Sequence, residues 1–286
     1  QLISHYVRLV DELRPRFVLF ENVRGLVTAR GETGTPGEVL RDIQRQLEEA
    51  GYASRIATLN AADYGAPQRR VRLLLPATAD YALPDFPSPT HAKEAAGGLL
   101  PWASLGDALS LLPEPDPADV VRPSGERAAS LRALAPGTGL RTNGRVMANR
   151  PSGQWGYRQD AFLADLSLPA RTVRAAGTPD WVHLPGDEDI RRLTWRECAA
   201  LQGFPSSWQF SGPLSQRFRQ IGNAVQTEVA RVLGDSVRSA LATGPVLESP
   251  ATPAWPAELR RRVRYTAAEA RVNGHLRVRD SALIDA

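Results

Sequence analysis

The chain contains 286 residues, of which 42% are hydrophobic and 23% are charged, and its net charge at pH 7 is +4. This length is enough for one large domain or two smaller ones, and no apolar run approaches the roughly 18 residues of a membrane-spanning helix. The composition therefore predicts a globular protein that remains in the cytoplasm, and it argues against a membrane protein.

Residues that bind metals or form disulfides are few. Cys198 is the single cysteine, so an intrachain disulfide framework is excluded. His5, His91, His183 and His275 are scattered and do not have the spacing of metal ligands. We therefore expect no metal site.

Basic residues are almost all arginine, since only Lys93 of the 35 is a lysine. This bias reflects either the codon usage of a GC-rich genome or recognition of phosphates and bases, for which the planar guanidinium is suited. The composition does not separate the two explanations.

Helical and extended patterns alternate in the first part of the chain. Apolar residues spaced by three and four predict a first helix that ends at Arg14-Pro15, and the run RFVLF predicts a strand buried on both sides. The predicted elements are a helix over 2–13, a strand over 16–20, a helix over 36–50 ended by Gly51, a strand over 53–59, a turn at 63–65 and a strand that begins with the arginines. Their alternation predicts an α/β fold.

Residues 84–170 have no regular period. Prolines and glycines recur at short intervals, and the aromatic residues Phe86, Trp102, Trp155 and Tyr157 are spaced among arginines. This composition indicates a second, irregular module.

Helical patterns return after this module. Thr194 and Glu197 have the spacing of a capping box, and Leu193 and Cys198 occupy the two hydrophobic-staple positions, so Cys198 is expected to be buried. A last long helix is predicted over 224–241, followed by a Pro- and Ala-rich linker and a basic tail.

Two polar segments are candidates for a site. Glu21 and Asn22 follow the first predicted strand, and ligands bind at the carboxyl ends of strands in open α/β sheets. On a strand, Gln68, Arg70 and Arg72 would share one face. Taken alone, Glu21 also fits a helix cap or a solvated acid, and the arginines also fit an exposed basic edge strand.

Four segments, taken together and in this order, resemble the later conserved blocks of the DNA (cytosine-5)-methyltransferases. They are ENV at 21–23, NAADYGAPQRRVRLLL at 60–75, RRLTWRECAALQGFP at 191–205 and QRFRQIGNAV at 216–225. FPSPTH at 86–91 is similar to the entry into the target-recognition region of that family. The resemblance covers roughly residues 1–91 and 167–238. It implies a partial Rossmann-like, S-adenosylmethionine-dependent methyltransferase sheet with a smaller irregular target-recognition domain.

The resemblance implies methyl transfer from S-adenosylmethionine to C5 of a cytosine that is flipped out of double-stranded DNA, in a restriction-modification enzyme. Glu21 would hold the N3 and N4 edge of the base and favour protonation of N3. Arg72 would donate to O2 of the base. Arg70 would pair with Glu21 or brace the pocket.

Further residues receive supporting roles from the same resemblance. Asn22, Val23 and Gln68 would support the substrate pocket, and Asn223 would help to hold the cofactor. Read by itself, Asn223 also fits a cap of the helix predicted to follow it.

The implied organisation has four segments. Residues 1–83 would form part of the catalytic domain, 84–190 the target-recognition region, 191–241 motifs that return to the catalytic domain, and 242–286 a linker and basic tail. The arginines of the tail either touch DNA or form a solvated helix face. We expect a bacterial, nucleoid-associated location.

Some parts of the family pattern are not found. The glycine-rich cofactor turn, the acidic residue for the ribose and the Pro-Cys nucleophile loop belong upstream of ENV, and Cys198 lies in a different motif. Together with a start at Gln1 inside a helical pattern, this predicts a carboxyl-terminal portion, either a fragment or one subunit of a split enzyme with an amino-terminal partner. Alone, the chain is expected to be inactive. The alternatives are a noncatalytic DNA-recognition subunit and a transfer-RNA cytosine-5 methyltransferase.

Overall fold

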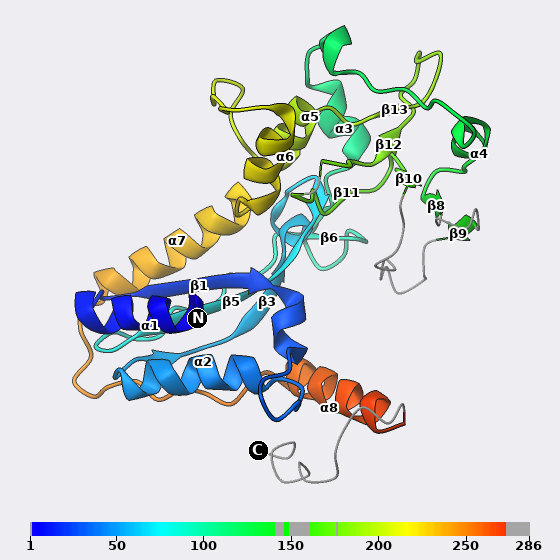
Figure 1. The fold of residues 1–286 in the computed structure, drawn as a ribbon. Coiled ribbons are helices and arrows are strands. Elements are labelled where there is room, and N and C mark those ends of the chain that lie inside the picture. The colour runs from blue at the N-terminus through cyan, green and yellow to red at the C-terminus, as the bar shows by residue number, and fades with distance from the viewer. Residues whose placement is uncertain (1, 141–145, 149–160, 176, 273–286) are drawn as a thin grey trace. The chain divides into compact units, whose positions relative to one another are not determined.

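A computed structural model describes residues 2–140, 146–148, 161–175 and 177–272 (Figure 1). The chain divides into two compact units, and each is described separately. The first comprises residues 1–59, 71–87 and 232–286, and the second comprises residues 60–70 and 88–231. These boundaries differ from the segment limits predicted from the sequence at 83/84 and 190/191. The functional assignment of the segments remains a prediction.

The first unit is built on a small sheet whose central strand is β5 (Val71–Thr78). β1 (Val18–Val23) and β2 (Ala53–Ser54) flank β5 and run antiparallel to it, and β3 (Ala57–Asn60) also pairs with it. Leu73, Leu75 and Ala77 alternate along β5 and enter one hydrophobic core. The alternation of helices and strands predicted an α/β fold, which the structure confirms.

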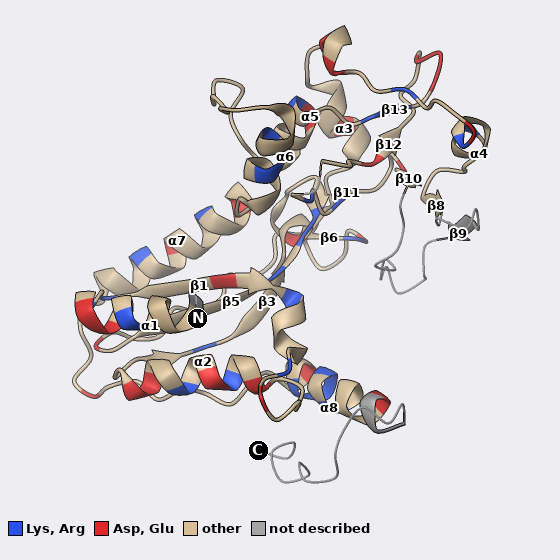
Figure 2. Cartoon of the chain, viewed as in Figure 1, with Lys and Arg blue, Asp and Glu red and all other residues tan. Residues whose placement is uncertain are grey.

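Two helices pack on this core. α1 (Leu2–Leu13) ends at the predicted position, and α2 (Glu38–Glu49) buries Leu40, Ile43 and Leu47 at helical spacing. Acidic and basic side chains are interleaved along α2 (Figure 2). Gly51 follows α2 with φ +82°, a conformation that glycine adopts without strain, so the predicted terminator is confirmed.

Two predicted strand boundaries were wrong. The first strand extends to Val23, because Glu21, Asn22 and Val23 pair with Leu74, Leu73 and Arg72 of β5. The ENV segment is therefore part of a strand and does not follow one. The strand predicted over 53–59 is interrupted, and forms the separate strands β2 and β3.

Part of the segment predicted as a linker and basic tail contributes to the core of the first unit. α8 (Ala257–Val272) buries Leu259, Val263 and Ala267, which recur every four residues. Leu259 and Val263 belong to the same core as α1 and α2. The sequence left open whether the arginines of this tail touch DNA or lie on a solvated helix face, and it did not indicate that the helix has a buried side.

The second unit consists of short elements around its own cores. β13 (Arg191–Arg192), β12 (Trp181–Val182), β10 (Ala161–Leu163), β8 (Thr138–Leu140) and β9 (Val146–Ala148) form one sheet in this order, β11 (Ala170–Arg171) pairs with β4 (Gln68–Arg69), and β6 (His91–Ala92) pairs with β7 (Leu100–Pro101). Its helices are α3 (Leu105–Ser110), α4 (Ala128–Arg132), α5 (Trp195–Leu201) and α6 (Leu214–Asn223). Short strands agree with the irregular composition. The predicted aromatic residues Trp155 and Tyr157, and also His275, lie outside the described residues.

The start of α5 confirms the capping box. The Thr194 hydroxyl accepts from the backbone N–H of Glu197 at 3.3 Å, and the Glu197 carboxylate accepts from the backbone N–H of Thr194 at 2.7 Å. Leu193 and Cys198 are both buried in one core, with Cys198 only 1% exposed. Packing in this core is therefore enough to explain why a cysteine stands at position 198.

α7 (Thr227–Ala242) begins three residues later than predicted. The buried Gln226 causes this shift, because its side-chain oxygen accepts from the backbone N–H groups of Glu228 and Val229 at 2.8 and 3.2 Å. Among the described residues, no helix is long and apolar enough to cross a membrane, and no group of three or more potential metal ligands gathers.

The packing of α8 is tested by Leu259→Ala. We expect the free energy of unfolding to fall by about 2–5 kcal/mol, because a large side chain that is 3% exposed leaves a cavity. Leu247→Ala is the matched control, since Leu247 is fully exposed in the same unit and its loss should change stability by less than about 0.5 kcal/mol. Urea denaturation measures both, and equal effects would contradict the packing of α8.

Candidate functional site

A partly buried ion pair lies across two neighbouring strands of the first unit. Glu21 on β1 and Arg72 on β5 are offset by two positions in the pairing register, so their side chains meet on one face. The Nε of Arg72 lies 2.9 Å from Oε1 of Glu21, and the side chains are 13% and 26% exposed. The arrangement places a carboxylate and a guanidinium side by side with partial access to solvent.

Burial determines the electrostatics of Arg72. Burial lowers the pKa of the Arg72 guanidinium, and the negative charge and hydrogen bond of Glu21 act in the opposite direction. The Nη1 of Arg72 donates to the backbone carbonyl of Val71 at 3.0 Å. Its Nη2 has no partner among the described residues, and is therefore available to a bound acceptor.

The other two ENV residues have different environments. The side-chain oxygen of Asn22 accepts from the backbone N–H of Val23 at 2.8 Å, which fixes the Asn22 side chain against its own strand. Val23 is 54% exposed. The roles predicted for both in supporting a pocket remain predictions.

Gln68 lies in the second unit and is completely buried. Its side-chain nitrogen donates to the Leu201 carbonyl at 3.1 Å and to the side-chain oxygen of Gln202 at 2.9 Å, and its oxygen accepts from the Val173 N–H at 2.8 Å. The Gln202 nitrogen in turn donates to the Ile221 carbonyl at 2.7 Å. This network joins β4 to the end of α5 and to α6.

Arg70 is also in the second unit, where it is 2% exposed. Its Nη1 donates to the Val173 carbonyl at 2.9 Å, and its Nη2 donates to the carbonyls of Gly222 and Ala224 at 2.8 and 2.9 Å. A guanidinium at the carboxyl end of α6 satisfies carbonyls that have no partner inside the helix. These contacts favour the bracing role that the sequence left open for Arg70.

The expectation that Gln68, Arg70 and Arg72 share one strand face was wrong. β4 ends at Arg69 and β5 begins at Val71, so Arg70 lies at a break between the strands. The structure brings Glu21 and Arg72 together in the first unit. It brings Gln68 and Arg70 to backbone carbonyls in the second unit.

Asn223 is the last residue of α6 and is exposed. It does not cap the following helix, because Gln226 has that function. The preceding residue explains the local sequence better: a Cβ on Gly222 would lie 2.2 Å from the backbone nitrogen of Ala175. Only glycine allows α6 to approach this backbone so closely.

Sequence reasoning missed Asp63 of the NAADYG segment as a partly buried polar side chain with partners of its own. The Oδ1 of Asp63 accepts from the Trp102 indole N–H at 2.9 Å and from the Asn60 side-chain nitrogen at 3.1 Å. Burial raises the pKa of Asp63, and these two hydrogen bonds act in the opposite direction. Asp63 was visible within the quoted motif, but Trp102 lies 39 residues away and no local signal joins it to Asp63.

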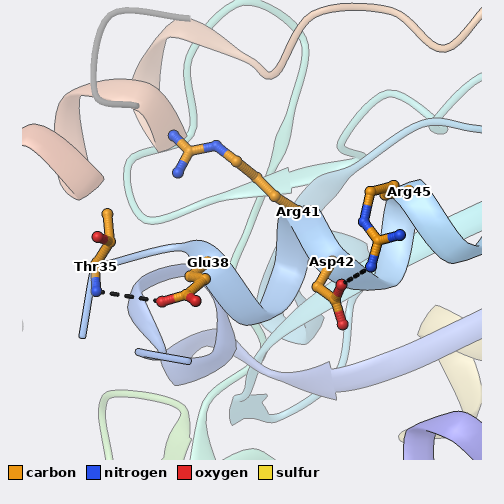
Figure 3. Close-up of a pocket in the computed structure, with 5 residues that line it drawn as sticks. All are labelled: Thr35, Glu38, Arg41, Asp42 and Arg45. Carbon is orange, nitrogen blue, oxygen red and sulfur yellow. Dashed lines mark hydrogen bonds and ion pairs between the residues drawn. The ribbon is translucent and has the colours of Figure 1, made fainter. Parts of the chain in front are cut away.

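A surface pocket on α2 is lined by Thr35, Glu38, Arg41, Asp42 and Arg45 (Figure 3). The charged side chains of this pocket already interact with other residues of the chain. Glu38 accepts from Thr35, Asp42 pairs with Arg45, and Arg41 lies over the Trp255 ring with its guanidinium carbon 5.1 Å from the ring centroid. We therefore assign no ligand to this pocket.

Comparison with known proteins agrees with the motifs. The family model described as C-5 cytosine-specific DNA methylase matches residues 1–99 and 137–239. The chain is 29% identical to the Type II methyltransferase M.BsuRI of Bacillus subtilis, over 82% of the chain and 52% of that protein. It is 30% identical to the Type II methyltransferase M.SacI of Streptomyces achromogenes, over 81% and 62%. The chain thus spans about half to three fifths of the length of these relatives.

Solved structures share the fold. A putative DNA modification methyltransferase encoded within an E. coli prophage matches with a TM-score of 0.52 and 21% identity, over 83% of this chain and 73% of that one. The S. pombe Dnmt2 methyltransferase matches with a TM-score of 0.52 and 17% identity, over 80% and 68%. At these identities the likeness concerns the fold.

The bracing by Arg70 predicts a loss of stability in Arg70→Met. The buried carbonyls of Val173 and Gly222 lose their donor, and the Ala224 carbonyl keeps only its hydrogen bond from Gln202, so the free energy of unfolding should fall by about 3 kcal/mol or more. Arg219→Met, an exposed site on α6, removes the same charge and should change stability by less than about 0.5 kcal/mol. Similar denaturation midpoints for the two variants would refute the bracing role.

The close approach at Gly222 predicts the effect of Gly222→Ala. The added methyl group collides with the backbone of Ala175 and should reduce the free energy of unfolding by about 1–3 kcal/mol or more. Gly234→Ala in α7 is the control: no atom lies within 4 Å of its Cβ position, and alanine should stabilise the helix by about 0.5–1 kcal/mol. Thermal unfolding should therefore shift in opposite directions for the two variants.

Proposed function

Because the chain belongs to the family of C-5 cytosine-specific DNA methylases, we propose that its 286 residues hold the target base in an enzyme that methylates C5 of cytosine in double-stranded DNA. The names of its relatives support a Type II, restriction-modification enzyme. S-adenosylmethionine supplies the methyl group in this chemistry. The observation that carries the proposal is the Glu21–Arg72 pair.

The pair fits the edge of a cytosine. Attack by a thiolate at C6 moves electron density toward N3 and O2 of the ring, so a proton donor and a fixed cation at this edge stabilise the product of addition. In the complex with the base, one oxygen of the Glu21 carboxyl group would share a proton with N3, and the other would accept from the N4 amino group. Arg72 donates to O2, for which its Nη2 is available, while its Nε keeps the Glu21 side chain in place.

The nucleophile of this reaction is not Cys198. Burial raises the pKa of the Cys198 thiol, and the residue is 1% exposed inside a core. A thiol must ionise and reach the substrate in order to attack. The nucleophile is therefore expected from a segment other than these residues, in the same polypeptide or in a partner subunit, and the chain alone should be inactive.

Only Asn223 is assigned to the cofactor in this chain. It is exposed at the end of α6, where the backbone is fixed by Arg70 and Gly222. A single amide side chain does not make a binding site for the cofactor. Gln68 and Arg70 act by positioning this end of α6.

The proposal predicts that Glu21→Gln in the complete protein lowers turnover by about 100-fold or more, since the general acid at N3 is lost. The dissociation constant for DNA should change by much less, because glutamine keeps the size and part of the hydrogen bonding of the side chain. Transfer of a radiolabelled methyl group to duplex DNA measures the first quantity, and fluorescence anisotropy measures the second. An unchanged rate would overturn the assignment of Glu21.

Two controls separate the alternatives. Glu32→Gln removes an exposed carboxylate of the same unit and should leave turnover unchanged. Bisulfite sequencing of DNA and RNA from cells that express the complete protein should show new 5-methylcytosine in DNA. Its appearance only in RNA would support the transfer-RNA alternative, and its absence from both would support a noncatalytic DNA-recognition subunit.

A further inference from the structure

α8 lies outside the residues matched by the family model and is nevertheless fixed on the first unit. Leu259 and Val263 enter the core, and the Trp255 indole N–H donates to the side-chain oxygen of Gln44 just before the helix begins. The Arg41 guanidinium lies over the same indole ring. The buried side of α8 is thus determined, and so is the side that faces solvent.

The solvent side carries three arginines, Arg260, Arg261 and Arg264, which we name the α8 arginine face. All three are exposed, and their spacing places them within about 100° of one another around the helix. None forms an ion pair with a carboxylate of the described residues. The α8 arginine face therefore carries positive charge that no described carboxylate pairs with, and Figure 2 shows the basic residues of α8 in blue together with the acidic residues of the same helix in red.

The other long surface helices of the first unit differ in this respect. Their exposed arginines pair with an acid three or four residues away. These pairs are Arg8–Glu12 at 2.5 Å in α1, Arg45–Glu49 at 2.6 Å in α2 and Arg238–Asp235 at 2.9 Å in α7. Like charges four residues apart weaken a helix by a few tenths of a kcal/mol, so α8 retains a small cost that neighbouring helices avoid.

α8 also lies next to the segment that follows the strand of the proposed base-holding pair. α8 packs against the 3-10 helix η1 (Arg24–Thr28), which begins directly after the ENV segment of β1 (Figure 1). A Cβ on Gly37 would lie only 3.2 Å from the Val263 side chain, which shows how closely α8 approaches this region. The segment that follows Glu21 is thus bordered by the arginine-bearing helix.

We propose that the α8 arginine face binds backbone phosphates of double-stranded DNA, beside the target site, and adds affinity that is independent of sequence. The planar guanidinium matches the oxygens of a phosphate, and a duplex presents a row of phosphates to a row of cations. The proposal rests on the proposed function only for the identity of the polyanion. It assigns a partner to a segment that the family match leaves without one.

The test compares two triple variants that carry the same change in net charge. Arg260→Gln, Arg261→Gln and Arg264→Gln together remove the α8 arginine face. Arg8→Gln, Arg45→Gln and Arg238→Gln together remove three paired arginines from α1, α2 and α7 of the same unit. The complete protein is titrated into a fluorescent duplex of arbitrary sequence, and the dissociation constant is measured from about 50 to about 200 mM salt.

Each phosphate contact contributes about 0.9 to the slope of log affinity against log salt, so loss of the α8 arginine face should reduce that slope by up to about 2.7. Over a fourfold change in salt, the unmodified protein should then lose roughly 40-fold more affinity than the variant. The paired-arginine variant should keep the original slope. Replacing the three α8 residues with lysine should also keep it, because lysine retains the charge.

The inference is overturned if the α8 variant keeps the original slope, or if both triple variants reduce it equally. Binding to vesicles that contain phosphatidylserine, without binding to duplex DNA, would also overturn it and indicate a membrane surface. Methyl transfer is measured separately. If the unmodified complete protein does not methylate but the α8 variant has a smaller salt slope, the proposed function is contradicted and the inference is supported. If the complete protein methylates normally but the α8 variant keeps the original slope, the proposed function is supported and the inference is overturned.

Discussion

The guanidinium of Arg70 holds the second unit together at the point where α6 ends. The last carbonyls of a helix have no partner within the helix, and burying them without a donor costs about 1–3 kcal/mol each. Arg70 satisfies the carbonyls of Gly222 and Ala224, and also that of Val173. The Gln68–Gln202 pair does the same for a neighbouring carbonyl, because Gln68 donates to Gln202 and the Gln202 nitrogen donates to the carbonyl of Ile221. The short strand β4, the region after β11 and the end of α6 thus depend on Gln68 and Arg70, which are two positions apart in the sequence, together with Gln202.

Sequence reasoning succeeded where the signal was local. The capping box at Thr194 and Glu197, the glycine that ends α2 and the burial of Cys198 each depend on residues within one or two turns. It failed at Arg70, because alternation places every second residue on the same face only while the strand is continuous, and β4 ends at Arg69. The break at Arg70 is imposed by partners more than one hundred residues away, and nothing near Arg70 announces them.

The helix boundaries show a related limit. Asn223 is a good capping residue by type, but Gln226 caps α7, since the chain turns after α6 before the next helix begins. For α8, the apolar positions were present in the sequence at a spacing of four, but they were outnumbered by arginines. The residue types in both segments allow more than one helix start or buried side, and contacts with distant parts of the chain determine which one forms.

The burial of Cys198 has a practical consequence. It is the only cysteine of these 286 residues, and its enclosed thiol is poorly ionised and out of reach of reagents. A cysteine introduced at an exposed position would therefore be the one site among these residues that reacts with a maleimide under native conditions. Fluorophores or spin labels could be attached at chosen positions, such as Glu258 or Ala268 on α8, without first removing a native thiol from the core.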